Sequence, residues 1–116
     1  ELPLWYSAAD ALVLCSSREG WANVLLESMA CSTPVVATNV GGTAEALSAP
    51  EAGVLMQDRS PAGLVAAVGK LFASYPERKM VRQFAEQFDW QATTRGQLAL
   101  FQAAVAAQQS GLRQYA

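Results

Sequence analysis

Three short apolar runs, separated by helical patterns, organise the first half of the chain. The runs at residues 11–15 and 34–38 are continuous rather than alternating, which is typical of strands covered on both faces of a parallel sheet. Pro34 opens the second run, at a position where its missing N–H is tolerated. Residues 53–56 form a third, shorter candidate. The pattern predicts the α/β class, with about three parallel strands and flanking helices.

Helical periodicity fills the segments between these runs and the last third of the chain. We expect a helix near residues 22–31, with Asn23 or a neighbour as its cap, and a short helix at residues 43–47. Three later segments repeat apolar residues at helical spacing, the first opening at Ser60 and the last at Asp89. The apolar side chains expected to face inward are Trp5, Ala22, Leu25, Leu26, Met29, Leu64, Val65, Val68, Leu71, Phe72, Met80, Val81, Phe84, Phe88, Trp90, Leu98, Phe101 and Val105.

Composition fits one globular domain and narrows its chemistry. The chain has 116 residues, of which 52% are hydrophobic and 16% charged, and a formal net charge of −2. Its Lys and Arg residues are scattered, so no basic stripe is present to bind nucleic acid, and we exclude that partner. The sequence has no His, which removes the commonest general base. Any chemistry here must depend on carboxylates, hydroxyls and backbone amides.

Two features bear on the compartment. No apolar run is long enough to cross a bilayer, and the first residues do not resemble a signal peptide. Cys15 and Cys31 fit no metal-binding spacing and lie in apolar segments, where we expect them to be small core residues. We expect a cytoplasmic location, with peripheral association at the inner face of the membrane as an alternative.

The segment at residues 16–30 combines a strand end, a loop and a helix start. In open α/β sheets, ligands bind just beyond the carboxyl ends of the strands. The first N–H groups of the helix and its dipole favour an anion such as a diphosphate, and Gly20 lets the backbone approach it closely. Glu27, about one turn into the helix, is placed to accept hydrogen bonds from vicinal ribose hydroxyls, and Glu19 from the hydroxyls of a sugar.

Glu19 and Glu27 have seven residues between them, and this spacing resembles the E-x7-E motif of retaining glycosyltransferases of the GT-B fold. The likeness is greatest to glycosyltransferase family 4, the "glycosyl transferases group 1" domain, and it extends over about residues 5–105. A bare E-x7-E often arises by chance, whereas an ordered set of motifs does not. The other matching positions are Tyr6-Ser7-Ala8-Ala9-Asp10, Pro34-Val35-Val36-Ala37-Thr38, Gly41-Gly42, Glu45, Phe88 and Trp90.

The resemblance implies that residues 1–116 form one truncated nucleotide-sugar-binding domain, a partial Rossmann-like domain of a GT-B fold with a helical C-terminal third. It implies a nucleotide-diphospho-sugar donor and no metal or other cofactor. The acceptor, which the sequence leaves unspecified, would bind an N-terminal domain outside this chain. Glu19 is implied as the catalytic residue and Glu27 as the ribose ligand. The other donor-binding positions implied are Gly20, Trp21 and Ala22 at the sugar, and Asn23 and Val24 at the diphosphate.

Four positions depart from the family pattern. Cys15 stands where Pro is common, and Trp21 replaces the frequent Phe. Ala22 and Ser32 stand where Gly is frequent, and we expect Ala22 to add a methyl group beside the donor sugar. Gly41 and Gly42 either contact the donor or simply end a strand.

Other function classes stay open. A non-catalytic nucleotide-sugar-binding or interaction module fits the same pattern, as does a GT-B nucleotide-sugar epimerase. A Rossmann dehydrogenase is disfavoured, because no G-x-G-x-x-G follows a strand. For the isolated chain we expect no sugar transfer, and we expect self-association through the open edge of the strand at residues 11–15.

Overall fold

The computed structural model describes the backbone of residues 1–113 and the side chains of residues 1–108. In this part of the chain, one sheet holds the parallel strands β1 (Leu12–Leu14), β2 (Val35–Thr38) and β3 (Gly53–Met56), in the order β1-β2-β3. The three parallel strands predicted from the apolar runs are therefore confirmed. Because the strands are parallel, their carboxyl ends lie at one edge of the sheet.

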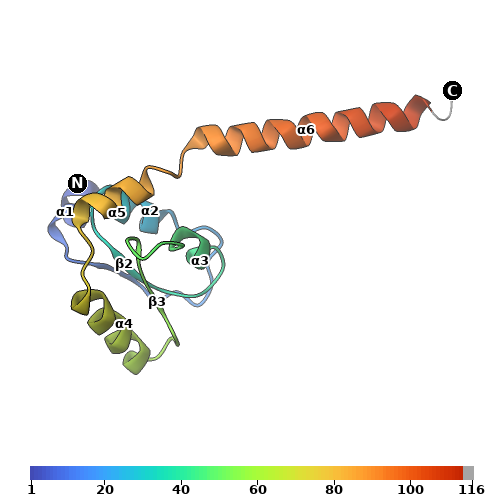
Figure 1. Ribbon diagram of the computed structural model, residues 1–116. Helices are drawn as coiled ribbons and strands as arrows, with labels where there is room; N and C mark the ends of the chain where they lie inside the picture. The colour runs from blue at the N-terminus through green and yellow to red at the C-terminus, as the bar shows by residue number, and fades with distance from the viewer. Residues whose placement is uncertain (114–116) are drawn as a thin grey trace.

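Helices cover both faces of the sheet (Figure 1). The helix α4 packs against β3 and β2 on one face, and α2 packs against β2 on the other, with α5 beside it. Two of the predicted caps are present. The Ser60 Oγ accepts the Gly63 N–H at 3.0 Å, and the Asp89 Oδ1 accepts the Ala92 N–H at 2.8 Å. The described helices are α1 (Leu2–Ala8), α2 (Asn23–Ala30), α3 (Thr43–Ala46), α4 (Pro61–Ala73), α5 (Arg78–Ala85) and α6 (Trp90–Arg113).

The core lies on both faces of the central strand β2, whose four residues are all buried. Val35 and Ala37 point toward α2 and α5, where they meet Leu25. Val36 points the opposite way, toward Leu71 of α4. This alternation is the two-residue period of a strand. The continuous apolar run at residues 34–38 therefore reflects a strand buried on both faces, as predicted.

The helix α1 is an element that the sequence patterns did not predict. Its apolar residues do not form a buried face, since Leu2, Leu4 and Trp5 are 62%, 74% and 74% exposed. The expectation that Trp5 is a core residue is wrong, because α1 lies at the surface and no residue of this helix is fully buried. Polar contacts with its neighbours, described below, take the place of an apolar interface.

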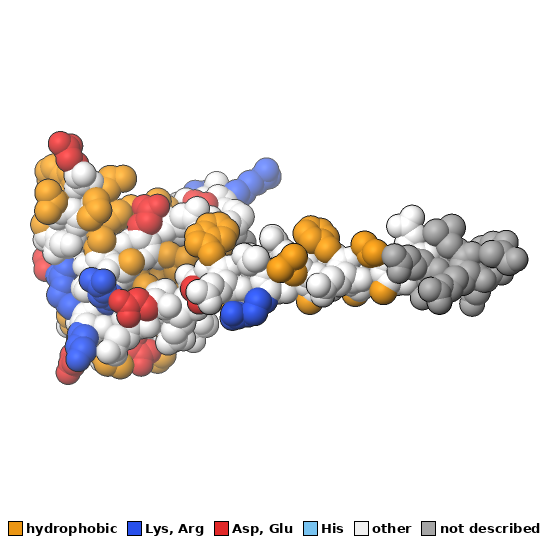
Figure 2. Space-filling model, turned by 90° about the horizontal axis from the view of Figure 1, so that it is seen from above, with side chains coloured by type: hydrophobic (Ala, Val, Ile, Leu, Met, Phe, Trp, Pro, Cys, Tyr) orange, Lys and Arg blue, Asp and Glu red, His pale blue; other side chains and the backbone are white. Residues whose placement is uncertain are grey.

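The helix α6 begins at Trp90 as predicted, but the side chains expected to face inward do not. Trp90, Leu98, Phe101 and Val105 are 84%, 53%, 66% and 54% exposed. The physical reason is that α6 projects away from the rest of the molecule (Figure 1), so these four apolar side chains stay largely exposed. Figure 2 shows apolar side chains along the projecting helix. Self-association of the chain stays a prediction.

The inward face of α4 is partly the one we expected, since Leu71 is buried and Leu64 and Val68 pack against the core. Gly63, Ala67 and Leu71, spaced four residues apart, are buried against the sheet. Val65 and Phe72 were expected inside but are 72% and 52% exposed. Small residues at the buried positions allow α4 to lie close to the strands, which leaves these two larger side chains at the surface.

Several positions at the margins of the core are also more exposed than expected. Val13 is 42% exposed, because β1 pairs with β2 on one side only and is not covered on both faces. Cys15 is exposed and Cys31 half-buried, so neither is a fully buried core residue, and both are free thiols. Met80 and Phe88 are 40% and 36% exposed at the two ends of α5, whereas Val81 and Phe84 are buried as predicted.

Candidate functional site

The carboxyl end of β1 leads through a loop at residues 15–22 into the start of α2. The helix begins at Asn23, and Ala22 occupies its N-cap position without any side-chain hydrogen bond. Of the two alternatives expected for the cap, Asn23 or a neighbour, the structure shows the neighbour Ala22, because Asn23 is already the first helical residue. The first N–H groups of a helix have no partner within the helix. At α2 these donors are free of a side-chain cap, and the positive end of the helix dipole lies at the same point.

A second loop, at residues 39–42, follows β2 and holds the first loop in place. The Thr38 Oγ1 donates to the Ser16 carbonyl at 2.7 Å, and the Gly42 N–H donates to the Gly20 carbonyl at 2.8 Å. The glycines are required by this packing. Gly41 has a φ of +53°, and a Cβ there would overlap the Glu19 carbonyl oxygen. The glycine pair thus allows two loops at neighbouring strand ends to pack backbone against backbone.

Thr43 stabilises the second loop through hydrogen bonds of its side chain. Its side chain is fully buried, and its Oγ1 lies 2.7 Å from the Thr38 carbonyl and 2.8 Å from the Val40 carbonyl. The same oxygen accepts the Val40 N–H at 2.9 Å. Sequence reasoning missed this role, since nothing in the pattern distinguishes Thr43 from any other threonine at a helix start.

The structure places the predicted donor-binding residues on one connected surface, with one exception. Gly20, Trp21, Asn23 and Val24 are exposed along the loop and the first turn of α2. Ala22 is only 6% exposed and belongs to the core beside α2. Its methyl group therefore packs inward, and the expectation that it lies beside the donor sugar is wrong. The backbone N–H of Ala22 and the other four residues stay candidates.

The Trp21 side chain packs against an aromatic residue that follows α5. Its ring centroid lies 6.0 Å from that of Phe88, which in turn makes an edge-on contact with Phe84 at 5.4 Å. Phe88 thus supports the loop from the end of α5. Glu45 lies in the first turn of α3, as expected for a helix-start carboxylate.

The two glutamates differ in their surroundings. Glu19 is half-buried in the loop, and Glu27 is exposed on the second turn of α2. The Glu27 Oε2 accepts a hydrogen bond from the Tyr6 hydroxyl of α1 at 3.0 Å. Partial burial, this hydrogen bond and the nearby charge of the Glu27 carboxylate raise the pKa of Tyr6 above its ordinary value. The Tyr6 hydroxyl therefore stays a donor throughout the neutral range.

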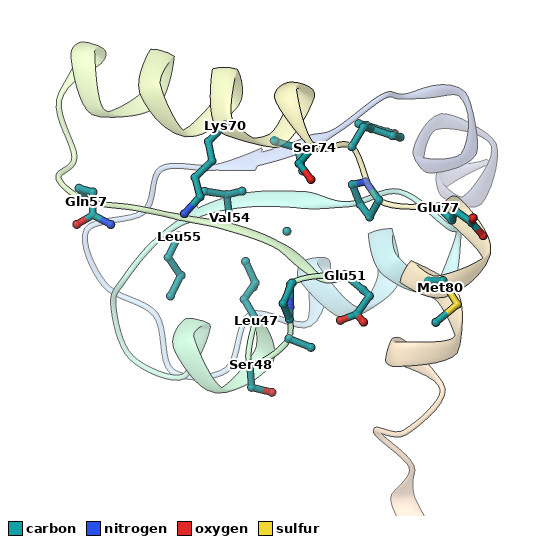
Figure 3. Close-up of a pocket in the computed structure, with 16 residues that line it drawn as sticks. Leu47, Ser48, Glu51, Val54, Leu55, Gln57, Lys70, Ser74, Glu77 and Met80 are labelled. Carbon is teal, nitrogen blue, oxygen red and sulfur yellow. The ribbon is translucent and has the colours of Figure 1, made fainter.

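A cavity of about 790 Å³ lies elsewhere, along β3 and between α4 and α5 (Figure 3). The charged residues that line it are Glu51, Lys70 and Glu77. It contains neither of the two glutamates of residues 16–30, and every buried side-chain polar atom in the described part of the chain has a hydrogen-bond partner. No unpaired group points to a ligand there. We therefore place the candidate site at the paired loops, where the chemistry-bearing residues lie.

Two findings concern metals and membranes. Among the residues that the structure describes, no group of three or more His, Cys, Asp and Glu side chains is placed to share a metal ion. None of the described helices combines the length and the apolar character needed to cross a membrane.

Comparison with known proteins supports the resemblance inferred from the motifs. Residues 1–88 match the family model described as glycosyl transferases group 1. The D-inositol 3-phosphate glycosyltransferase of Paenarthrobacter aurescens is 37% identical over 109 residues, covering 90% of this chain and 27% of that protein. The enzyme of the same name from Salinispora tropica is 33% identical over 120 residues, covering 100% of this chain and 25% of that protein. The chain thus spans about a quarter of the length of these curated relatives.

A solved structure gives the same result at the level of the fold. The sucrose-phosphate synthase from Thermosynechococcus elongatus superposes with a TM-score of 0.69 at 32% sequence identity, covering 90% of this chain and 27% of that chain. The fold class expected from the sequence, part of a Rossmann-like domain of a GT-B fold, is confirmed.

Proposed function

This chain belongs to the glycosyl transferases group 1 family, and from that premise we propose that it is the donor-binding part of a retaining glycosyltransferase. The parent enzyme would transfer a sugar from a nucleotide-diphospho-sugar to an acceptor. One observation carries the proposal. Two loops at the carboxyl ends of neighbouring parallel strands lock together beside a helix start without a side-chain cap, and a carboxylate lies on each side of that start.

The proposed roles follow from what each group offers. The N–H groups at Gly20 to Val24 would hold the diphosphate, because they are donors at the positive end of a helix dipole. Glu27, exposed one turn further along α2, would accept hydrogen bonds from the two ribose hydroxyls. Glu19, in the loop before the helix, would hold hydroxyls of the donor sugar. Along the chain, Glu19, the N–H groups and Glu27 follow one another in the same order as sugar, diphosphate and ribose in the donor.

The same arrangement suits the chemical step. As the bond between sugar and diphosphate breaks, negative charge grows on the leaving diphosphate. Backbone donors already aimed at that position stabilise the charge without having to reorganise. The packing of Gly42 against Gly20 keeps the loop in the required shape. The acceptor would bind to a part of the enzyme outside this chain, so we propose that the isolated chain transfers no sugar.

The test separates the two glutamates in the parent enzyme. Glu27→Ala should weaken the binding of nucleoside diphosphate by about 1.5–3 kcal/mol, the range for hydrogen bonds to charged groups. The ribose is bound equally in ground state and transition state, so KM for the donor should rise more than kcat falls. Glu19→Ala should lower kcat more than it raises KM, because misplacement at the reacting centre is costly.

Calorimetric titration with nucleoside diphosphate, paired with steady-state kinetics, measures both effects. The Glu19 variant should bind the diphosphate almost normally, since that ligand lacks the sugar. Glu86→Ala is the matched control, because this exposed carboxylate caps the end of α5 and forms an ion pair with Arg82. Normal diphosphate binding by both Glu19→Ala and Glu27→Ala would remove the ribose assignment and return Glu27 to an ordinary helix-surface carboxylate.

A further inference from the structure

We propose that Tyr6 is a positioning residue for the ribose site, acting through Glu27. This inference rests on the proposed function, and it assigns a role to α1, a helix that lies outside the loop and helix of residues 16–30. The Tyr6 hydroxyl donates to the Glu27 Oε2 at 3.0 Å, across 21 residues of sequence. Tyr6 is also half-buried, whereas the other residues of Leu2–Ala8 are exposed.

The contact matters because Glu27 is otherwise free to move. It lies on the exposed side of α2, and a glutamate at the surface of a helix samples several rotamers. A hydrogen bond from a fixed donor selects one of them before the ligand arrives. An ionised carboxylate has about four acceptor sites, of which Tyr6 uses one. The remaining sites can accept two ribose hydroxyls, so Tyr6 orients the carboxylate and still leaves acceptor sites for the ligand.

The donor is itself fixed, which distinguishes it from a chance surface contact. The Thr33 Oγ1 donates to the Tyr6 carbonyl at 2.6 Å. Arg78 of α5 donates to the carbonyls of Ser7 and Ala9 at 2.8 and 3.1 Å, and to the Thr33 Oγ1 at 2.8 Å. A guanidinium at the carboxyl end of a helix also meets the negative end of its dipole. The end of α1 that carries Tyr6 is therefore tied to α5 and to the turn after α2.

The decisive experiment is a ligand comparison in the parent enzyme. Nucleoside diphosphate and its 2′,3′-dideoxy analogue are titrated by calorimetry against wild type, Tyr6→Phe and Glu27→Gln. Tyr6→Phe keeps the ring and removes only the hydroxyl. It should weaken the binding of nucleoside diphosphate roughly threefold to tenfold, the effect of one lost hydrogen bond, and leave the dideoxy analogue unaffected. KM for the donor should rise by the same factor, with kcat nearly unchanged.

The chain offers a matched control in Tyr75. Its hydroxyl also makes one long-range hydrogen bond, to the Asp10 carbonyl at 2.7 Å, but it does not contact Glu27. Tyr75→Phe should leave the affinity for both ligands unchanged. If Tyr6 served only to attach α1, Tyr6→Phe would weaken both ligands equally or neither, and either result overturns the inference.

The outcomes also separate this inference from the proposed function. If Glu27→Gln weakens the binding of nucleoside diphosphate and Tyr6→Phe does not, the ribose assignment stands and the role of Tyr6 is wrong. If Glu27→Gln has no effect on this ligand, the ribose assignment fails, and the role of Tyr6 fails with it. Loss of ribose discrimination in both variants, with Tyr75→Phe unaffected, supports the inference.

Discussion

The α/β body (residues 1–88) and the helix α6 bury their apolar residues to very different extents. Every fully buried hydrophobic residue of the described chain lies between Ala22 and Ala85. In α6 every large apolar side chain within the described residues 90–108 is more than half exposed. The radius of gyration is 19.0 Å, against about 13 Å for a compact chain of this length. The family match at residues 1–88 ends where the body ends.

The difference shows what an apolar stripe can and cannot reveal. In α2 and in α6 alike, helical spacing of apolar residues predicts the helix correctly. In α2 the same spacing also predicts the buried face, because Leu25 and Met29 meet β2 and α5 within the chain. In α6 the spacing does not predict a buried face, because Leu98 and Phe101 are 53% and 66% exposed. Helix formation is local, whereas burial depends on which surface is available.

The largest expected effect tests this contrast with the same substitution in both regions. Leu25→Ala should lower the free energy of unfolding by about 2–5 kcal/mol, because Leu25 is fully buried and the change leaves a cavity. Leu98→Ala, at a residue 53% exposed in α6, should change it by less than about 0.5 kcal/mol. Urea denaturation of the chain followed by circular dichroism measures both. Similar losses in the two variants would mean that α6 packs against the body in solution.

A second prediction concerns α1, which has exposed apolar residues like α6 but is tied to the body by polar contacts. Arg78→Met keeps an apolar stem and removes the hydrogen bonds to Ser7, Ala9 and Thr33. It should lower the free energy of unfolding by about 1.5–3 kcal/mol, the range for hydrogen bonds involving a charged group. Arg82→Met is the control on the same helix. Its ion pair with Glu86 is about 60% exposed, so this loss should stay below about 0.5 kcal/mol.

Equal small losses for both arginine variants would show that Arg78 does not hold α1. The same urea titration serves, with limited proteolysis near residues 1–10 as a second readout. Only Arg78→Met should make this segment more susceptible to cleavage.

The smallest expected change in the free energy of unfolding comes from a third comparison between a residue of the body and a residue of α6. Ser32 follows α2 with a φ of +67°, a conformation that costs a residue with a Cβ about 1–2 kcal/mol. Ser32→Gly should raise the free energy of unfolding by about 1 kcal/mol, part of the gain being offset by the freer unfolded chain. Gly96→Ala in α6 meets nothing within 4 Å. It should raise helix content without moving the unfolding midpoint of the body, and a shift of that midpoint would contradict the separation of the two regions.

Much of the body could be predicted because its elements depend on local patterns. The continuous apolar run at Val35–Thr38 indicated a strand buried on both faces, and the cap at Ser60 indicated the start of α4. The helical pattern also predicted Ala22 on the apolar face of α2, and the structure buries it in the core there. The family motif instead suggested that its methyl group lies beside the donor sugar, which burial rules out.

The surroundings of the candidate site were the least predictable part. The contact between Tyr6 and Glu27 depends on how α1 docks, and that docking depends on Arg78, which lies 71 residues beyond Ser7 in the chain. No periodicity records a pairing between side chains so far apart. The motif predicted which residues share a loop and a helix start, whereas the contacts that position them, such as that of Tyr6 with Glu27, are visible only in the folded structure.

Amide hydrogen exchange of the parent enzyme, with and without nucleoside diphosphate, tests whether the donor binds at the two paired loops and the start of α2. The account predicts slower exchange on binding at residues 19–27 and in the loop at residues 39–42, because the ligand would cover the start of α2 and stiffen the two loops that pack there. Exchange in α4 (Pro61–Ala73), which lies on the other face of the sheet, should not change. Protection confined to the cavity beside β3, at residues 47–57 and 70–80, with none at residues 19–27, would contradict the assignment of the donor site.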